Sequence, residues 1–315
     1  MDELQNNLYK LSKLSETKEI DLYLTKLVKD ILDIQLQKNK NKNKYLLISS
    51  VGNNSVHRDC KWNYINKSYD ILFIYYQDFT YKESEYYLRM RGKKLSQYYY
   101  IFQHKLLDYY NYIFILDNDN FIKGESINKL FILADELKCN IMGPSIRIRD
   151  IDHKKVLKLL IYYNNIKKKD KNFWFIKNKL PNHLLEIYNH VIKYSYWPHM
   201  IQRYDIKKKY IRQTNLVEDG RSIINTKLIK EFRTDLKFMK LFKSGIMFDQ
   251  ILANLCKFKK IYVVDYIYYI HLDPYKDKVN EYNEEKIIKK YLKKNNIKII
   301  NIYPDLIIDK KFILE

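Results

Sequence analysis

Hydrophobic and polar positions alternate along this chain in blocks that predict both strands and helices. Short continuous apolar runs predict buried strands at 45–51, 69–76, 112–116 and 140–143. Apolar residues at helical spacing predict helices between them, at about 56–62, 83–90, 94–109 and 125–137. Strands that alternate with helices in this way predict an α/β fold with a Rossmann-like sheet, mixed but mostly parallel, flanked by helices.

The flanking segments have different patterns. Apolar residues at helical spacing over 5–37 predict one or two amphipathic helices, and 38–44, made only of Lys and Asn, predicts a solvated linker. Residues of about 150–193 predict a helical insertion. Further elements are predicted as strands at 211–217 and 222–224, a helix at 248–256, paired strands at 260–264 and 266–270, a helix at 283–294 and a strand at 297–302. We therefore expect an N-terminal extension (1–44), a main domain (45–275) and a C-terminal helix-strand extension (276–315).

The composition indicates a globular protein with an anionic partner. Hydrophobic residues make up 46% of the 315 residues, and 58 Lys+Arg against 37 Asp+Glu give a net charge of +21. A basic surface attracts nucleotides, nucleic acids or lipid headgroups without distinguishing between them. The chain is also rich in Lys, Asn, Ile and Tyr, which is typical of an AT-rich genome. Drift toward Lys at solvated positions is therefore an alternative source of part of the charge.

Cysteine usage and the N-terminus bear on location. The three cysteines (Cys60, Cys139 and Cys256) are widely spaced and form neither a CxxC nor a metal-ligand pattern, which suits a reducing compartment. The first residues lack the basic and apolar regions of a signal peptide, and no apolar run approaches the roughly 20 residues of a transmembrane segment. We expect a soluble cytoplasmic protein, located in the cytosol of a host cell if a virus encodes it.

Two acids follow the third predicted strand directly. Asp117 and Asp119 are one residue apart, at the carboxyl end of 112–116, where the strands of an open α/β sheet meet the ligand crevice. Neighbouring carboxylates repel each other unless a proton or a cation lies between them. Mg²⁺ and Mn²⁺ bind one or two carboxylates together with phosphate oxygens. The pair therefore predicts a metal site that binds phosphate, and the alternative is a turn or helix-capping role.

Several stretches, in order, carry a resemblance to a known superfamily. They are Ser50-Val51-Gly52 with Ser55 and His57, Tyr69-Asp70-Ile71-Leu72 with Tyr75-Tyr76, Gly92-Lys93-Lys94, Phe114-Ile115-Leu116-Asp117-Asn118-Asp119, Ser195-Tyr196-Trp197-Pro198, Arg203-Tyr204, Thr214-Asn215-Leu216-Val217-Glu218, Gly245 with Asp249, and Val264-Asp265 with His271. On these stretches the chain resembles the metal-dependent glycosyltransferases of the GT-A fold, and most closely the family known as domain of unknown function 707. It departs from that family at Asn118, where a third acid is usual, and at 219–221, where apolar residues are usual.

The resemblance implies a donor site for a nucleotide-diphospho-sugar, above all a UDP-sugar, with Mn²⁺ or Mg²⁺. By this resemblance Asp119 binds the metal directly, and Asp117 contacts the ribose or binds the metal through water. His271 matches a further metal-ligand position, which would favour Mn²⁺ because imidazole is a poor ligand for Mg²⁺. The alternative for His271 is a surface histidine beside Asp273.

The ends of the first two strands are expected to hold the nucleoside. Ser50, Val51 and Gly52 end the first strand, and glycine allows the backbone to approach a planar ring. Asp78 follows the second strand and offers a carboxylate to sugar or base donors, or else serves only in a turn. Lys94 is expected either to contact phosphate as a point charge or to lie on a solvated helix face.

The acceptor side is less defined by the sequence. An inverting transfer needs a general base for the acceptor hydroxyl, and the resemblance implies Asp249 for this role, with Glu218 as second candidate and helix capping as the alternative for Asp249. Trp197 and Tyr204 are expected to stack on a sugar ring or to pack in the core. The acceptor would be a glycan or glycoconjugate.

Other functions also fit parts of the pattern. A nucleic-acid-binding protein could use the +21 charge and the tyrosines, but no recognised nucleic-acid motif is present, so we expect no such partner. A metal-dependent nucleotidyltransferase would share the acid pair, and an inactive relative would keep the fold alone.

Overall fold

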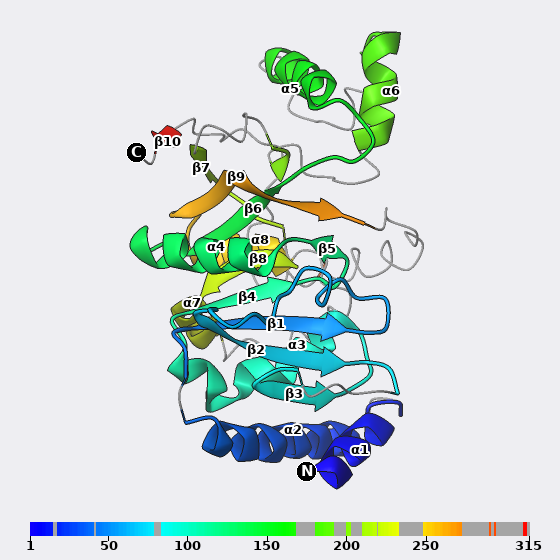
Figure 1. Cartoon of the computed structure of the whole chain (residues 1–315), viewed down its shortest axis with the longest axis vertical. Helices are drawn as coiled ribbons and strands as arrows, with labels where there is room; N and C mark the ends of the chain where they lie inside the picture. Colours follow the sequence, from blue (N-terminus) through cyan, green and yellow to red (C-terminus); the bar gives the residue numbers. More distant parts are fainter. Residues whose placement is uncertain are drawn as a thin grey trace.

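The computed structural model describes residues 1–14, 18–40, 42–78, 83–167, 180–191, 200–202, 210–218, 220–232, 248–272, 290, 293 and 311–313. Its centre is a mixed sheet (Figure 1). The strands are β1 (Tyr45–Val51), β2 (Tyr69–Tyr75), β3 (Tyr86–Arg89), β4 (Tyr112–Leu116), β5 (Asn120–Phe121), β6 (Ile141–Ile146), β7 (Tyr210–Thr214), β8 (Arg221–Asn225), β9 (Ile261–His271) and β10 (Lys311–Ile313). The helices are α1 (Asp2–Leu11), α2 (Lys18–Lys38), α3 (Lys94–Gln103), the 3₁₀ helix η1 (Lys105–Tyr109), α4 (Gly124–Glu136), α5 (His153–Lys167), α6 (Asn182–Val191), α7 (Thr226–Phe232) and α8 (Phe248–Leu255).

The strand order is β10-β7-β9-β6-β8-β4-β1-β2-β3, and β5 pairs separately with β9. Strands β3, β2, β1 and β4 are parallel, so their carboxyl ends lie along one edge of the sheet. Strand β8 runs antiparallel to both β4 and β6. The predicted α/β class, a mixed sheet flanked by helices, is confirmed.

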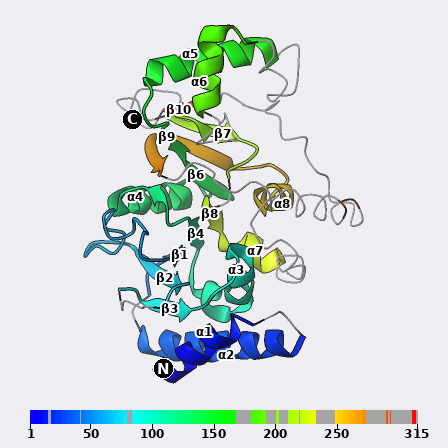
Figure 2. The same ribbon diagram turned by 90° about the vertical axis from the view of Figure 1, so that its right-hand side faces the viewer.

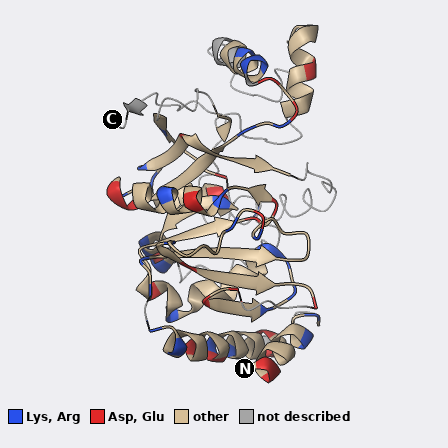
Figure 3. Ribbon diagram, viewed as in Figure 1, with Lys and Arg blue, Asp and Glu red and all other residues tan. Residues whose placement is uncertain are grey.

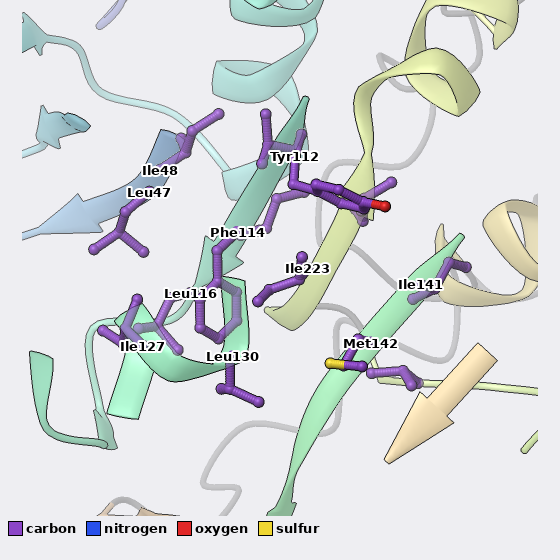
Figure 4. Close-up of a cluster of buried hydrophobic side chains, with 14 of the residues drawn as sticks. Leu47, Ile48, Tyr112, Phe114, Leu116, Ile127, Leu130, Ile141, Met142 and Ile223 are labelled. Atoms are coloured by element: carbon purple, nitrogen blue, oxygen red, sulfur yellow. The ribbon is translucent and has the colours of Figure 1, made fainter. Parts of the chain in front are cut away.

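Helices cover both faces of the sheet. Helix α4 lies on one face, and α3, α7 and α8 lie on the other (Figure 2). Every residue of β2 and β4 is buried, as expected for strands covered on both sides. Figure 4 shows the core beneath α4, where Ile127 and Leu130 lie among side chains of β1, β4, β6 and β8. Burial on both faces explains why these strands are continuous apolar runs in the sequence.

The N-terminal helices cover the open edge of the sheet at β3 (Figure 1). The side chain of Gln5 donates to the carbonyl of Tyr87 (2.7 Å) and accepts from the N–H of Arg89 (2.8 Å). The side chain of Gln35 donates to the same carbonyl (2.9 Å) and accepts from the N–H of Tyr87 (3.0 Å). Two buried glutamines thus satisfy backbone groups that an edge strand would otherwise expose. The predicted helices over 5–37 are confirmed as α1 and α2.

The predicted linker at 38–44 does more than connect the two parts. Asn43 donates to buried Asp70 on β2 through its side chain (2.8 Å), and the Asn39 amide approaches the same carboxylate at 3.4 Å. The hydroxyl of Tyr110 donates to Asp70 as well (2.6 Å). The prediction that this segment is only solvated is therefore wrong at Asn39 and Asn43, because they supply hydrogen bonds to a buried carboxylate.

Six predicted elements differ from the structure. Residues 56–62 form turns, and the helix predicted over 83–90 is strand β3, because its tyrosines and Leu88 pair along β2. The helix over 94–109 is interrupted at His104, whose ring accepts from the N–H of Leu106 (3.1 Å) and caps η1. The two predicted strands at 260–264 and 266–270 are one strand, β9. Strand β6 continues through Pro144, where its register on β9 shifts.

Helices α5 and α6 pair with each other beyond the β9 side of the sheet and belong to the predicted insertion (Figure 1). The helix predicted at 283–294 and the strand predicted at 297–302 lie outside the described residues, apart from single helical positions at 290 and 293.

Among the helices that the structure describes, none combines the length and hydrophobicity needed to span a membrane. Acidic and basic residues are mixed along α2 and α4, while the strands are largely free of charge (Figure 3).

Candidate active site

The first acid of the pair is held against the segment before β8. The backbone N–H of Asp117 donates to the carbonyl of Gly220 (2.9 Å), and the ammonium of Lys94 lies 2.7 Å from Asp117 Oδ1. Gly220 has φ +72°, and a Cβ placed there would lie 2.0 Å from Asp117 Oδ2 and 2.5 Å from Lys94 Nζ. A glycine is therefore required at this position both by its backbone conformation and by the ion pair.

The second acid is placed by a strand pairing. β5 pairs with the end of β9, so Asn120 lies opposite His271, and the N–H of Leu272 donates to the carbonyl of Asp119 (3.1 Å). This pairing brings His271 Nε2 to 3.1 Å from Asp119 Oδ2. The alternative for His271, a surface histidine beside Asp273, is wrong in that His271 is buried, and Asp273 itself lies outside the described residues. Two predicted metal ligands that are far apart in the sequence are neighbours in the structure.

A buried arginine lies directly behind the acid pair. Arg221, at the start of β8, forms an ion pair with Glu218 and donates to Asn120 Oδ1 (3.2 Å). Its guanidinium lies over the ring of Tyr269, 4.9 Å from the ring centroid. Asn120 in turn donates to the carbonyl of Gly220 (3.1 Å). These contacts connect the loop after β4, the segment before β8 and the strand β9.

The surroundings shift the pKa values of the two acids in opposite directions. Burial raises the pKa of Asp117 above its ordinary value, although the charge of Lys94 acts against this shift. Burial acts to raise the pKa of Asp119 as well, but the hydrogen bond and charge of His271, together with the charges of Arg221 and Lys94, outweigh it and keep that pKa below its ordinary value. Asp119 is therefore the acid that stays ionised most readily, as a metal ligand must be.

The donor set fits a divalent metal that completes its shell with phosphate and water. Asp119 Oδ1 is buried and has no hydrogen-bond partner among the residues that the structure describes, so this oxygen is available to a cation. An imidazole beside a carboxylate suits Mn²⁺. Within the described part of the chain, however, no three His, Cys, Asp or Glu side chains are grouped as a metal centre. Asp117 already forms an ion pair with Lys94, and this ammonium would compete with a metal for the carboxylate.

The end of β1 is tied to the middle of the acid motif. Asn118 donates to the hydroxyls of Ser55 (2.9 Å) and Tyr76 (3.0 Å), and its carbonyl accepts from the N–H of Val56. The Ser55 hydroxyl also accepts from the N–H of Gly52 (2.6 Å). A Cβ at Gly52 would lie 2.5 Å from the Tyr76 hydroxyl. The predicted nucleoside-binding glycine and the acid pair are thus parts of one connected cluster.

The remaining candidates of the donor site are placed less centrally. Ser50 donates to the side chain of Gln97 on α3 (2.6 Å), and Val51 is fully buried. Asp78 is exposed and lies 3.9 Å from Lys13, where a hydrogen bond from Tyr9 lowers its pKa. The structure therefore joins Asp78 to the N-terminal helices and gives it no contact with the acid pair.

The two candidate bases are both buried. Glu218 is engaged by Arg221, and its backbone carbonyl accepts from the Ser222 hydroxyl (2.7 Å). Asp249 is the second residue of α8 and accepts from the N–H of the next residue, Gln250 (2.7 Å), whereas a helix-capping side chain precedes the helix and accepts from an N–H two or three residues further on. Gly245, Trp197, Tyr204 and Asp219 lie outside the described residues.

Sequence reasoning missed Arg221, Asn120 and Tyr269 as members of the site. The sequence did contain one indication, because an arginine next to the apolar residues of a strand needs a buried partner.

A cavity of about 450 Å³ lies elsewhere, lined by residues 57–58, 61, 63–66 and 83. It includes none of the acid-pair cluster.

Comparisons with known proteins give distant structural matches only. No protein-family model matches the chain, and no curated protein matches it. Among solved structures, the chain is similar to Staphylococcus aureus TarS 1–349, with 11% identity and a TM-score of 0.40 over 72% of this chain and 60% of that one. A second TarS 1–349 structure, in complex with UDP-GlcNAc, has 12% identity and a TM-score of 0.41 over 84% of this chain and 68% of that one. The chain thus spans less than two thirds of the first TarS structure.

Proposed function

We propose that this protein is a metal-dependent glycosyltransferase that moves a sugar from a nucleotide-diphospho-sugar to a hydroxyl acceptor. The observation that carries the proposal is the placement of Asp119 beside His271, with Asp117 and Lys94 adjacent, at the carboxyl end of β4. An acid pair, an imidazole and a lysine at the end of a central strand suit a metal-bound diphosphate.

Each group of the cluster has a physical role in this proposal. The metal, when bound, supplies positive charge that stabilises the leaving diphosphate. Asp119 and His271 would hold it, Mn²⁺ being preferred to Mg²⁺ because of the imidazole, with Asp117 as a further ligand or a ribose contact. Lys94 would bind a phosphate oxygen. The absence of a side chain at Gly52 leaves room for the ring of Tyr76 at the end of β1, and the base of the donor, a UDP-sugar by preference, would bind beside this ring.

Proton removal from the acceptor, a glycan or glycoconjugate, is the second requirement. In an inverting reaction the base must face the sugar from the side opposite the leaving group. We propose Asp249 first, because the carboxylate of Glu218 already serves as the counter-ion of Arg221. Glu218 is the second candidate. In the Asp249→Asn variant we expect donor binding to persist and transfer to be lost.

Donor hydrolysis is the direct test. The purified protein is incubated with a panel of nucleotide-sugars and Mn²⁺ without acceptor, and the released nucleoside diphosphate is measured by chromatography. We expect slow hydrolysis of one donor that stops when EDTA is added. Asp119→Ala should reduce it by about 100-fold or more, because several kcal/mol of charge stabilisation depend on the metal.

The exposed Asp59 provides the matched control, since Asp59→Ala removes the same charge outside the cluster and should leave hydrolysis unchanged. Hydrolysis of no donor, with Asp119→Ala equal to the wild type, would refute the proposal. Release of pyrophosphate from nucleoside triphosphates would instead identify a nucleotidyltransferase. Tight binding to single-stranded nucleic acid that weakens steeply with salt would instead favour a nucleic-acid-binding protein.

A further inference from the structure

The ion pair between Lys94 and Asp117 occupies the place where the metal would meet its second carboxylate. The Lys94 ammonium lies 2.7 Å from Asp117 Oδ1, on the side that Gly220 leaves open. An ammonium on this oxygen repels a divalent metal that approaches the same carboxylate, so the two cations compete for it. The protein therefore holds an internal cation that competes with the metal for Asp117.

The lysine is able to move without disturbing the fold. Lys94 is the first residue of α3, and its side chain is partly exposed, so its ammonium can turn away by rotation about side-chain bonds alone. The N-terminus of α3 has no side-chain cap from Lys93. A diphosphate bound next to Lys94 would therefore also meet the positive end of the α3 dipole.

Charge balance indicates when the lysine moves. Three carboxylates of the cluster (Asp117, Asp119 and Glu218) face two side-chain cations (Lys94 and Arg221). The net charge of these groups is negative, and a divalent cation alone makes it positive. A diphosphate diester, which carries two negative charges, makes the net charge negative again. Metal and diphosphate are thus favoured together over either one alone.

We propose that Lys94 is an exchangeable counter-ion, which neutralises Asp117 in the ligand-free protein and transfers to the donor diphosphate when the metal takes its place. The inference rests on the proposed function and adds to it an obligatory coupling between metal and nucleotide. Coupling of this kind is reciprocal, so each ligand must tighten the binding of the other by the same factor.

The test measures binding and not turnover. Mn²⁺ binding is followed by the electron paramagnetic resonance signal of the free ion, and UDP binding by calorimetry. In Lys94→Met we expect Mn²⁺ without nucleotide to bind about tenfold more tightly than in the wild type, because the competing cation is gone. UDP in the presence of Mn²⁺ should bind about tenfold more weakly, because the phosphate partner is gone; both values lie within the usual range of coupling.

Two variants serve as controls. Lys93→Met removes the same charge from the neighbouring exposed residue and should leave both affinities within about twofold of the wild type. Lys94→Arg keeps the positive charge and should retain weak Mn²⁺ binding without nucleotide. Changes of opposite sign for metal and nucleotide cannot arise from a merely structural ion pair, whose loss would weaken both.

Three results would overturn the inference, and they are distinguishable. If Mn²⁺ without nucleotide binds Lys94→Met no more tightly than the wild type, Lys94 does not compete with the metal. If Lys94→Met does not fold, the binding of Mn²⁺ and UDP is measured in the wild type alone. An Mn²⁺ affinity there that does not depend on UDP refutes the exchange. If the wild type binds neither Mn²⁺ nor UDP, the proposed function itself fails together with the inference.

Discussion

The buried pair of Arg221 and Glu218 allows a quantitative test of the architecture around the site. Both side chains are almost completely buried, with 2% and 8% of their surfaces exposed. In Arg221→Met the length and apolar stem of the side chain are roughly kept, but Glu218 loses its ion-pair partner, the guanidinium. Asn120 loses a donor, and Tyr269 loses the cation over its ring.

The expected loss of stability is large because the remaining charge lies in a poorly hydrated place. Removal of one partner of a buried ion pair costs about 3–5 kcal/mol. The chain offers a matched comparison in Arg58, which also pairs with a glutamate, Glu83, but with 45% and 29% of the side-chain surfaces exposed. Arg58→Met should cost only about 0–1 kcal/mol. Urea denaturation followed by circular dichroism gives both values.

The double variant identifies the cause. If the cost arises from a charge buried without its partner, Glu218→Gln added to Arg221→Met should recover much of the lost stability, with a coupling energy of about 1–3 kcal/mol between the sites. A cost below about 1 kcal/mol for Arg221→Met, or equal costs for Arg221→Met and Arg58→Met, would show that burial does not determine the strength of this pair.

Three further predictions concern other parts of the molecule. Gln5→Ala and Gln35→Ala should each lower the free energy of unfolding by about 1–3 kcal/mol, measured by urea denaturation, because each leaves backbone groups of β3 without partners. Gly220→Ala should cost at least about 1–2 kcal/mol in a thermal melt, for the left-handed conformation alone, and its Cβ should also displace the carboxylate of Asp117. Burial lowers the pKa of His57 from its ordinary 6.5, so the unfolded chain takes up a proton at a higher pH than the folded protein. The corresponding stability is fully present above pH 6.5 and is lost as the pH falls toward the lowered pKa, so His57→Gln should flatten the dependence of the unfolding free energy on pH between 5 and 8.

Buried strands were predictable from the sequence because burial on both faces leaves a continuous apolar run. β1 agrees with its predicted bounds, and β4 agrees as well. Strand β3 was not predictable in the same way. Its residues alternate between buried and partly exposed, and the backbone groups on its outer side bond to the side chains of Gln5 and Gln35, from helices more than fifty residues earlier. A pattern within one window cannot reveal partners at that distance.

The same physical limit applies to the candidate site. Asp117 and Asp119 were recognisable because two acids directly follow a buried strand. The position of His271 depends on the pairing of β5 with β9, and β5 has only two residues. Asp78 follows its strand as the prediction requires, but Lys13 and Tyr9 hold it against α1. The end of a strand therefore defines a region of the sheet edge and does not fix which side chains meet there.

The asparagine between the two acids shows how one departure from a motif can support its geometry. A carboxylate at position 118 would only accept hydrogen bonds, whereas the amide of Asn118 donates to both Ser55 and Tyr76. Through Ser55 this amide also fixes the N–H of Gly52 at the end of β1. A third acid would add repulsion to the pair, and the hydroxyls of Ser55 and Tyr76 would have to donate to it instead of accepting from the amide. Asn118 therefore connects the predicted nucleoside and metal parts of the cluster while it keeps the charge between them low.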